Sequence, residues 1–106
     1  MSHIIVLMTA STEEEADKIV RQLLNQRLIV CANTLSPVKS KYWWKNKTEE
    51  TNECLVIMKT QEKLFEELTE TVRRLHSYEV PEILALPIVG DWPPYLEWLD
   101  SVLESR

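Results

Sequence analysis

Four short apolar segments and three amphipathic segments, in the order β-α-β-β-α-β-α, predict a single α+β domain over residues 1–106. The length fits one domain, and the chain contains no linker, repeat or low-complexity stretch. The apolar strands show little alternation with polar residues, which indicates that both faces of the sheet are covered.

The first strand is expected at Ile4–Thr9, a β-branched run bounded by polar residues. A helix is expected over residues 12–27. Ser11 is the predicted N-cap, and Glu14, three residues later, completes a capping box. The buried face of this helix follows from apolar spacings of three and four: Ala16, Ile19, Val20, Leu23 and Leu24.

The second strand is predicted at Leu28–Leu35 and resumes at Lys39–Trp44, because Pro37 between them cannot donate a ladder hydrogen bond and marks a bulge or an edge. The polar segment Lys45–Thr48 is expected at the tip of a hairpin. The third strand is predicted at Glu53–Lys59.

Thr60 is the expected cap of a second helix that runs to His76. The fourth strand is predicted at Ile83–Val89, with Pro87 placing its far end at an edge of the sheet. A last helix opens at Asp91–Pro94, where proline suits the first turn. Its apolar stripe is Tyr95, Leu96, Trp98, Leu99, Val102 and Leu103.

The first six elements form the split βαβ unit of ferredoxin-like folds, in which two helices cover one face of a four-stranded antiparallel sheet. The first strand nevertheless presents Ile5 and Leu7 on the face opposite Ile4 and Val6. The last helix is expected to cover part of that second face. The remainder would be an apolar patch of several hundred Å², so we expect several copies of the chain to assemble.

The composition excludes several classes of function. A net charge of −5 argues against nucleic-acid binding, which requires basic surface. Apolar runs such as Ile4–Met8 are too short to cross a membrane. The single glycine, Gly90, rules out glycine-rich phosphate loops, and no catalytic motif is present. Two cysteines without an export signal predict a cytoplasmic protein.

The two cysteines are expected to be unpaired. A hairpin centred near Asn46 pairs Cys31 with a residue beyond Thr60 and Cys54 with one near Lys39, which separates the two thiols too far for a disulfide. The apolar neighbours of Cys31 favour a packing role over that of a soft metal ligand.

Five blocks of residues, in order over essentially the whole chain, resemble the CutA family, the divalent-cation tolerance proteins. The blocks are Arg27-Leu28-Ile29-Val30-Cys31-Ala32-Asn33, Tyr42-Trp43-Trp44-x-Asn46-Lys47, Lys59-Thr60, His76-x-Tyr78-Glu79-Val80-Pro81-Glu82-Ile83 and Tyr95-Leu96-x-Trp98-Leu99.

This resemblance implies a homotrimer of ferredoxin-like subunits, with hairpins that reach around neighbouring subunits. It also implies a link to tolerance of copper and other divalent cations. Because no nucleophile–base spacing or paired-carboxylate motif is present, we expect a non-catalytic role with no required cofactor. The trimer is similar to that of the PII signalling proteins, so the alternative is a small-molecule sensor or an adaptor for an unidentified partner protein, linked to metals only indirectly.

Two residues depart from the family pattern. Ser77 stands where the family usually has proline after the histidine, and Asn46 stands where the hairpin usually has glycine. Asparagine tolerates a positive φ angle better than most residues, so the turn is expected to survive.

His76 is the one histidine outside the N-terminal tail and is a candidate metal ligand. Metal proposals for the family add its preceding neighbour and a cysteine of the first strand, and here those positions are Leu75 and Met8. One imidazole and one thioether cannot complete a coordination shell, so binding of a metal such as copper is expected to be weak. In the alternative reading, His76 forms hydrogen bonds at the end of its helix.

Lys59, His76, Tyr78 and Glu82 fall at strand or loop ends, and together they are a candidate pocket for a small molecule or anion at a subunit interface. The alternative is a structural polar network between subunits.

Tyr42, Trp43 and Trp44 are the candidate interface residues of the hairpin. With Lys45 and Lys47 beside them, they could instead stack a flat ligand such as a base, which the net charge disfavours.

Overall fold

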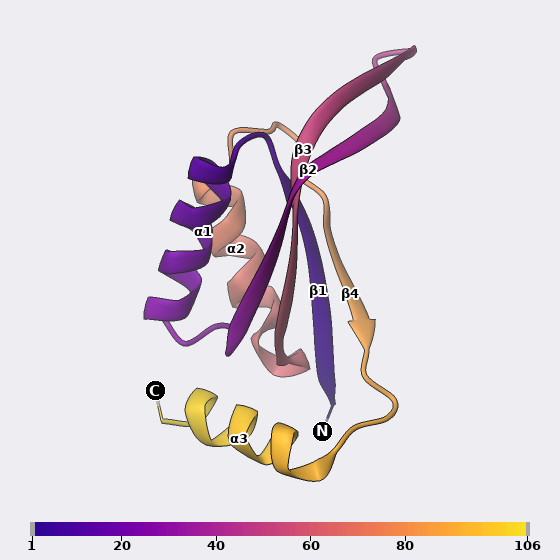
Figure 1. The fold of residues 1–106 in the computed structure, drawn as a ribbon. Helices are drawn as coiled ribbons and strands as arrows, with labels where there is room; N and C mark the ends of the chain where they lie inside the picture. Colours follow the sequence, from indigo (N-terminus) through magenta and orange to yellow (C-terminus); the bar gives the residue numbers. More distant parts are fainter. Residues whose placement is uncertain (1, 106) are drawn as a thin grey trace.

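The computed structural model describes residues 2–105 and has the predicted α+β architecture (Figure 1). The sheet order is β2-β3-β1-β4, and each neighbouring pair is antiparallel, which is the ferredoxin-like arrangement. A single 3-10 turn, η1, adds to the predicted order. The elements are β1 His3–Ala10, α1 Glu13–Asn25, β2 Cys31–Trp44, β3 Lys47–Gln61, η1 Glu62–Leu64, α2 Phe65–Leu75, β4 Ile83–Pro87 and α3 Pro93–Leu103.

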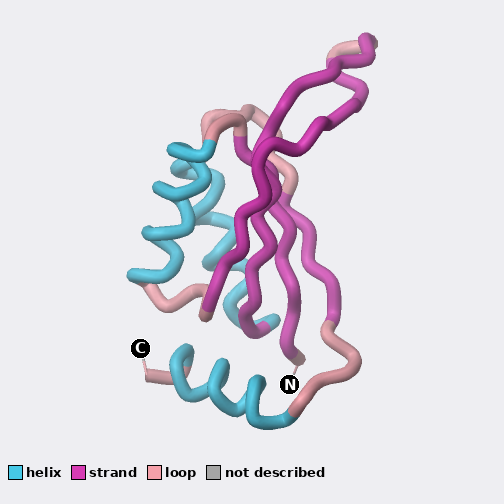
Figure 2. Tube along the Cα trace, viewed as in Figure 1, coloured by secondary structure: helices cyan, strands magenta, loops and turns pink. Residues whose placement is uncertain are grey.

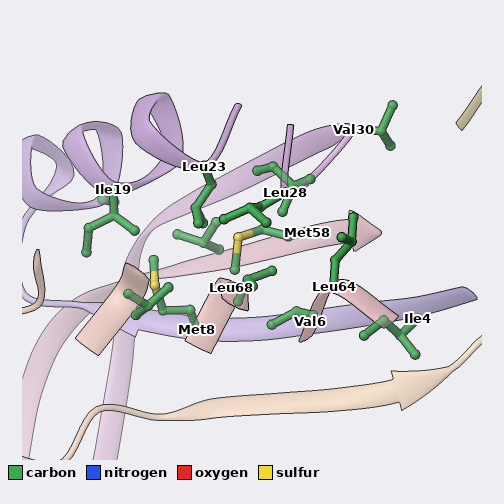
Figure 3. Close-up of a cluster of buried hydrophobic side chains, with 14 of the residues drawn as sticks. Ile4, Val6, Met8, Ile19, Leu23, Leu28, Val30, Met58, Leu64 and Leu68 are labelled. Carbon is green, nitrogen blue, oxygen red and sulfur yellow. The ribbon is translucent and has the colours of Figure 1, made fainter. Parts of the chain in front are cut away.

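The core lies between the sheet and the pair α1 and α2, which pack together on one face (Figures 1 and 2). Alternate residues of β1 and β3 point into it, because side chains alternate across a strand. Figure 3 shows Met8 and Met58 of the sheet meeting Ile19, Leu23 and Leu68 of the two helices. This face is therefore the one that the apolar spacing of the helices predicts.

The opposite face of the sheet, which we call the open face, is also apolar. Its large aliphatic side chains are half-buried or exposed: Ile5, Leu7, Leu35, Leu55, Ile57, Leu84 and Leu86. Exposed fractions reach 55% at Leu84 and 49% at Leu86. The prediction that the strands are apolar on both sides is confirmed.

Helix α3 crosses one end of the sheet and leaves most of the open face uncovered (Figure 1). Oδ1 of Asp100 accepts hydrogen bonds from Nε2 of His3 and Nε2 of Gln61, both at 2.8 Å. Leu99 and Leu103 are buried beneath the helix. The last helix thus covers part of the second face, as predicted.

Strands β2 and β3 extend past the rest of the sheet and form a protruding hairpin (Figure 2). The register shifts between Leu35 and Val38, which confirms the irregularity expected at Pro37. The predicted four-residue tip is wrong: only Lys45 and Asn46 form the turn, with φ angles of 50° and 66°. Strand β3 consequently begins at Lys47 and not at Glu53.

Other boundaries also differ from the sequence prediction. The N-cap of α1 is Thr12, whose Oγ1 accepts from the Glu15 amide at 3.1 Å, so neither Ser11 nor Glu14 plays the predicted part. Thr60 does not cap a helix: it lies within β3, and its Oγ1 donates to the carbonyl of Leu28 at 2.6 Å.

The second strand begins at Cys31 and not at Leu28. Arg27 has a φ of 52°, and the amide of Leu28 donates back to the carbonyl of Leu23 at 2.9 Å, which closes α1 in a left-handed turn. Leu28, Ile29 and Val30, which follow this turn, are buried but do not belong to the strand. At the other end of the fold, β4 stops at Pro87, where the ladder loses a donor.

Candidate functional site

His76 is the centre of a polar cluster where α2 ends, and its side chain is completely buried. Its Nε2 lies 2.7 Å from the carbonyl oxygen of Thr9, and its Nδ1 lies 3.1 Å from the amide of Tyr78. A carbonyl can only accept and an amide N–H can only donate, so Nε2 carries the proton and Nδ1 accepts. Both ring nitrogens are therefore used within the chain.

Tyr78 connects this cluster to a buried carboxylate. Its ring lies 4.7 Å from the His76 ring, and its hydroxyl donates to Oε2 of Glu53. Glu53 is only 6% exposed. Burial raises the pKa of Tyr78, and the hydrogen bond to Glu53 and its negative charge raise it further. The phenol therefore remains a donor over the whole physiological pH range.

Glu15 attaches the first turn of α1 to the same cluster. Its Oε2 accepts from the Ser77 amide at 2.6 Å and lies 3.9 Å from Nδ1 of His76. Its Oε1 accepts from the amide and the hydroxyl of Ser11, at 3.2 and 2.9 Å. Burial alone would raise the pKa of Glu15, but the bonds from Ser77 and Ser11 outweigh burial and lower it.

The four predicted pocket residues do not all meet within one chain. His76 and Tyr78 lie together, and Glu82 is exposed just before β4. Lys59 pairs with Ile5, near the other end of β1, and its ammonium donates to Oδ1 of Asn33. This pair lies four residues from the pair that Thr9 forms, roughly 13 Å along the sheet.

Sequence reasoning missed Glu53 and Glu15, the two carboxylates of the cluster. One feature of the sequence could have indicated Glu53: it is a charged residue directly before the buried part of β3, which starts at Cys54. A cavity of about 240 Å³ adjoins it. Its lining includes Ser11, Thr12, Ser36, Pro37, Asn52, Glu53 and Cys54.

The residues around His76 do not fit a metal centre. Met8 is completely buried on the helix side of the sheet (Figure 3). Leu75 offers no ligand atom. Within residues 2–105, no three His, Cys, Asp or Glu side chains are grouped so that they could hold a metal ion. Neither ring nitrogen of His76 has a lone pair free for a metal.

Both cysteines are free, as predicted, because Cys31 pairs across the sheet with Lys59 while Cys54 lies opposite the bulge. Sγ of Cys31 lies 3.6 Å from the hydroxyl of Tyr95. That hydrogen bond, together with burial, raises the pKa of Tyr95 to about 12. Sγ of Cys54 donates to the hydroxyl of Ser36 at 3.4 Å.

The aromatic residues of the hairpin are unevenly exposed in one chain. Trp43 is 74% exposed, whereas Tyr42 and Trp44 are about 40% exposed. The ammonium of Lys45 lies 5.6 Å from the centre of the Trp44 ring, a cation–π contact. Among the aromatic side chains of the hairpin, Trp43 thus has the most exposed apolar surface.

A protein family model, CutA1 divalent ion tolerance protein, matches residues 4–102. The chain belongs to the CutA1 family. The CutA resemblance noted in the sequence is therefore confirmed, and with it the fold that the resemblance implied.

CutA proteins of animals, plants and archaea are similar to this chain. Protein CutA of Mus musculus is 44% identical over 98 residues, which is 92% of this chain and 55% of the mouse protein. Divalent-cation tolerance protein CutA of Archaeoglobus fulgidus is 37% identical over 102 residues, 96% of this chain and 99% of the relative. The chain spans a little over half the length of the mouse, rice and human relatives.

Solved structures of CutA1 proteins superpose closely on the chain. The periplasmic divalent cation tolerance protein CutA of Archaeoglobus fulgidus gives a TM-score of 0.92 at 37% identity, covering 95% of this chain and 98% of its own. CutA1 of Oryza sativa gives 0.92 at 37% identity, covering 96% and 94%. The relatives in Archaeoglobus fulgidus and Pyrococcus horikoshii are named as divalent-cation tolerance proteins.

Proposed function

We propose that the protein acts as a homotrimer in tolerance of divalent cations such as copper, without a catalytic step. The observation that carries the assembly is the open face of the sheet, where Leu84 and Leu86 are about half exposed beside a continuous aliphatic surface. An apolar face of this extent is typical of a surface that other subunits cover.

The protruding hairpin supports the same proposal. It carries Tyr42, Trp43 and Trp44 beyond the body of the subunit, where its own chain leaves Trp43 74% exposed and the other two about 40% exposed. Aromatic side chains of this kind are enriched in interface cores. A hairpin that reaches a neighbouring subunit would bury Trp43, while the neighbour covers part of the open face.

The link to metal tolerance is drawn from the family and its named relatives. The described residues offer no tight metal centre, so we expect divalent cations to bind weakly and with little selectivity. Tolerance would then depend on the assembled protein itself and not on a metal ion that it binds tightly.

Oligomeric mass tests the assembly directly. Sedimentation or light scattering is expected to give three times 12.5 kDa. Leu84→Asp places a charge on the open face and should yield smaller species, whereas Lys18→Glu, on the exposed side of α1, should leave the mass unchanged. A monomeric wild-type chain at micromolar concentration would refute the trimer.

Growth tests the function. In a bacterial strain that lacks its own relative and is sensitive to copper, expression of this chain should restore growth in copper-containing medium. Leu84→Asp should restore it poorly and Lys18→Glu fully. Equal growth with the chain and with an empty vector would count against a role in tolerance.

A second candidate is a PII-like sensor or adaptor whose link to metals is indirect. The cavity of about 240 Å³ beside Glu53 favours it, because a buried carboxylate at a cavity can orient a small ligand. Lys59 would reach such a pocket only from a neighbouring subunit. Screening of metabolites by thermal shift, with Glu53→Gln as the control, separates this candidate from the first.

We place the protein in the cytoplasm as part of the proposal, because it carries two free cysteines. The relative in Archaeoglobus fulgidus is described as periplasmic. In residues 2–105, no helix has the length and apolar character needed to span a bilayer. Fractionation of cells that express the tagged chain tests the location.

A further inference from the structure

The name of the family implies a divalent cation, yet the one buried imidazole of this chain has no free nitrogen. The role of His76 therefore depends on which parts of the chain its two hydrogen bonds hold in place. The segment that matters is the connection from α2 to β4, residues 76–82, which we call the strap. Figure 1 shows it passing over the end of β1.

His76 fixes the start of the strap from two sides. Through Nε2 it is tied to Thr9 at the end of β1, and through Nδ1 it holds the amide of Tyr78. The Ser77 amide between them is held by Glu15 of α1. Two elements of the subunit body, β1 and α1, thus hold the first residues of the strap in place.

Tyr78 connects the fixed start of the strap to the hairpin. Its hydroxyl bonds to Glu53, and Glu53 pairs with Val38, the first paired residue of β2 beyond the bulge. The bulge is where the hairpin leaves the body of the sheet, since a bulge bends its strand and increases the local twist. The contact between Tyr78 and Glu53 therefore fixes the base of the hairpin against the strap.

We propose that His76 is a positioning residue that sets the direction of the hairpin through Tyr78 and Glu53, and not a metal ligand. The alternative role, a metal on Nδ1, would require loss of the bond from the Tyr78 amide. The inference rests on the proposed function in one respect only: it assigns to the hairpin its part in assembly.

Nitrogen NMR of the full chain with ¹⁵N-labelled histidine tests the role of the ring without any mutation. At neutral pH, His76 should show the neutral tautomer with the proton on Nε2. Addition of Zn²⁺ in slight excess should leave both of its nitrogen signals in place. The second histidine, His3, is the internal control. A proton on Nδ1, or displacement of the His76 signals by Zn²⁺, would overturn the proposal.

Hydrogen–deuterium exchange tests the path to the hairpin. His76→Ala should speed exchange of the strap and of residues 36–40 and 51–54 by about tenfold, the effect of one lost hydrogen bond on local opening. The matched control is His3→Ala, which removes the bond to Asp100 and should loosen α3 instead. Unchanged exchange at the base of the hairpin in His76→Ala would refute the path.

Two further variants keep the test decisive. Tyr78→Phe cuts the same path while leaving His76 in place, so it replaces His76→Ala if that chain does not fold. His76→Asn retains an acceptor near the position of Nδ1 and should restore part of the slow exchange. Trimer mass is measured on the same samples: a monomeric wild type refutes the assembly, whereas a trimer with unaltered exchange in the variants refutes only this inference.

Discussion

The hydroxyl of Tyr78 donates a hydrogen bond to the carboxylate of Glu53, which lies 25 positions earlier in the chain. The bond joins the strap to the base of the hairpin, two segments that no sequence pattern connects. Glu53 is nearly buried, and no other hydrogen bond to its carboxylate is seen within residues 2–105. A buried carboxylate that loses a donor bears a desolvation cost, so this contact should matter for stability.

Tyr78→Phe should therefore destabilise the fold by about 1–3 kcal/mol, the cost of leaving a buried polar group without its partner. Urea unfolding of wild type and variant measures the change. Glu53→Gln is the second arm of a double-mutant cycle, and the two substitutions should be less than additive because they remove one interaction. Full additivity would mean that the two side chains do not interact in solution.

Periodicity was sufficient to predict the elements of the subunit body. Both the apolar spacing of α1 and the two-sided strands are visible in sequence, because burial selects apolar residues at fixed intervals. The first half of β3 could not be found in this way. Residues 47–52 are polar and mostly exposed, and they are strand because they pair with β2, which the sequence does not display.

Local ambiguity explains the displaced cap of α1. Ser11 and Thr12 are both good N-caps, and the run Glu13–Glu15 offers an acceptor at either spacing, so the sequence does not distinguish the two registers. The candidate site shows a different limit. His76 and Tyr78 were identified because they lie close in sequence, whereas Glu53 reaches them only through the fold.

The lowered pKa of Glu15 predicts loss of stability in acid. A carboxyl group whose pKa in the folded chain is below its ordinary value of 4.5 contributes stability above that value, and the contribution is lost as the pH falls through the folded pKa. The free energy of unfolding should therefore decrease below about pH 4.5. Glu15→Gln should flatten this decrease, as urea unfolding at a series of pH values would show.

Glu14→Gln provides the matched control, since Glu14 is the exposed neighbour on the same helix turn. It should leave the slope of stability against pH close to that of wild type. A slope in Glu15→Gln equal to that of wild type would show that the bonds from Ser77 and Ser11 do not favour the ionised form.

The turn at Lys45 and Asn46 predicts a graded response to substitution. Both residues have positive φ angles, where a β-branched residue is strained by about 1–2 kcal/mol and glycine is not. Asn46→Val should lower the melting temperature by several degrees, while Asn46→Gly should leave it within a degree or two of wild type. Calorimetry measures both, and equal melting of the two variants would contradict the turn geometry.

Metal binding should be weak and independent of His76. Calorimetric titration of the wild type with Cu²⁺ or Zn²⁺ should show no tight site, since no three ligands converge among the described residues. His76→Ala should give the same titration curve as wild type. One tight site per subunit that disappears in His76→Ala would establish the imidazole as a ligand after all.

Trp43 is the side chain on which assembly should depend most. It is 74% exposed in a single chain, whereas Trp44 is 39% exposed and already has Lys45 against its ring. Truncation of a buried aromatic residue typically costs about 3–5 kcal/mol, and a threefold axis repeats the loss at each interface. Trp43→Ala should therefore weaken the trimer more than Trp44→Ala does.

Dilution separates a weakened interface from a damaged subunit, because the stability of an oligomer depends on the concentration of its protomers. Sedimentation from micromolar to nanomolar concentration should show Trp43→Ala dissociating at concentrations where the wild type remains intact. Tyr42→Phe keeps the ring and serves as the control. If both tryptophan variants remain trimeric at nanomolar concentration with unchanged melting, neither ring anchors the interface. The hairpin would then be better read as a platform on which a flat ligand stacks.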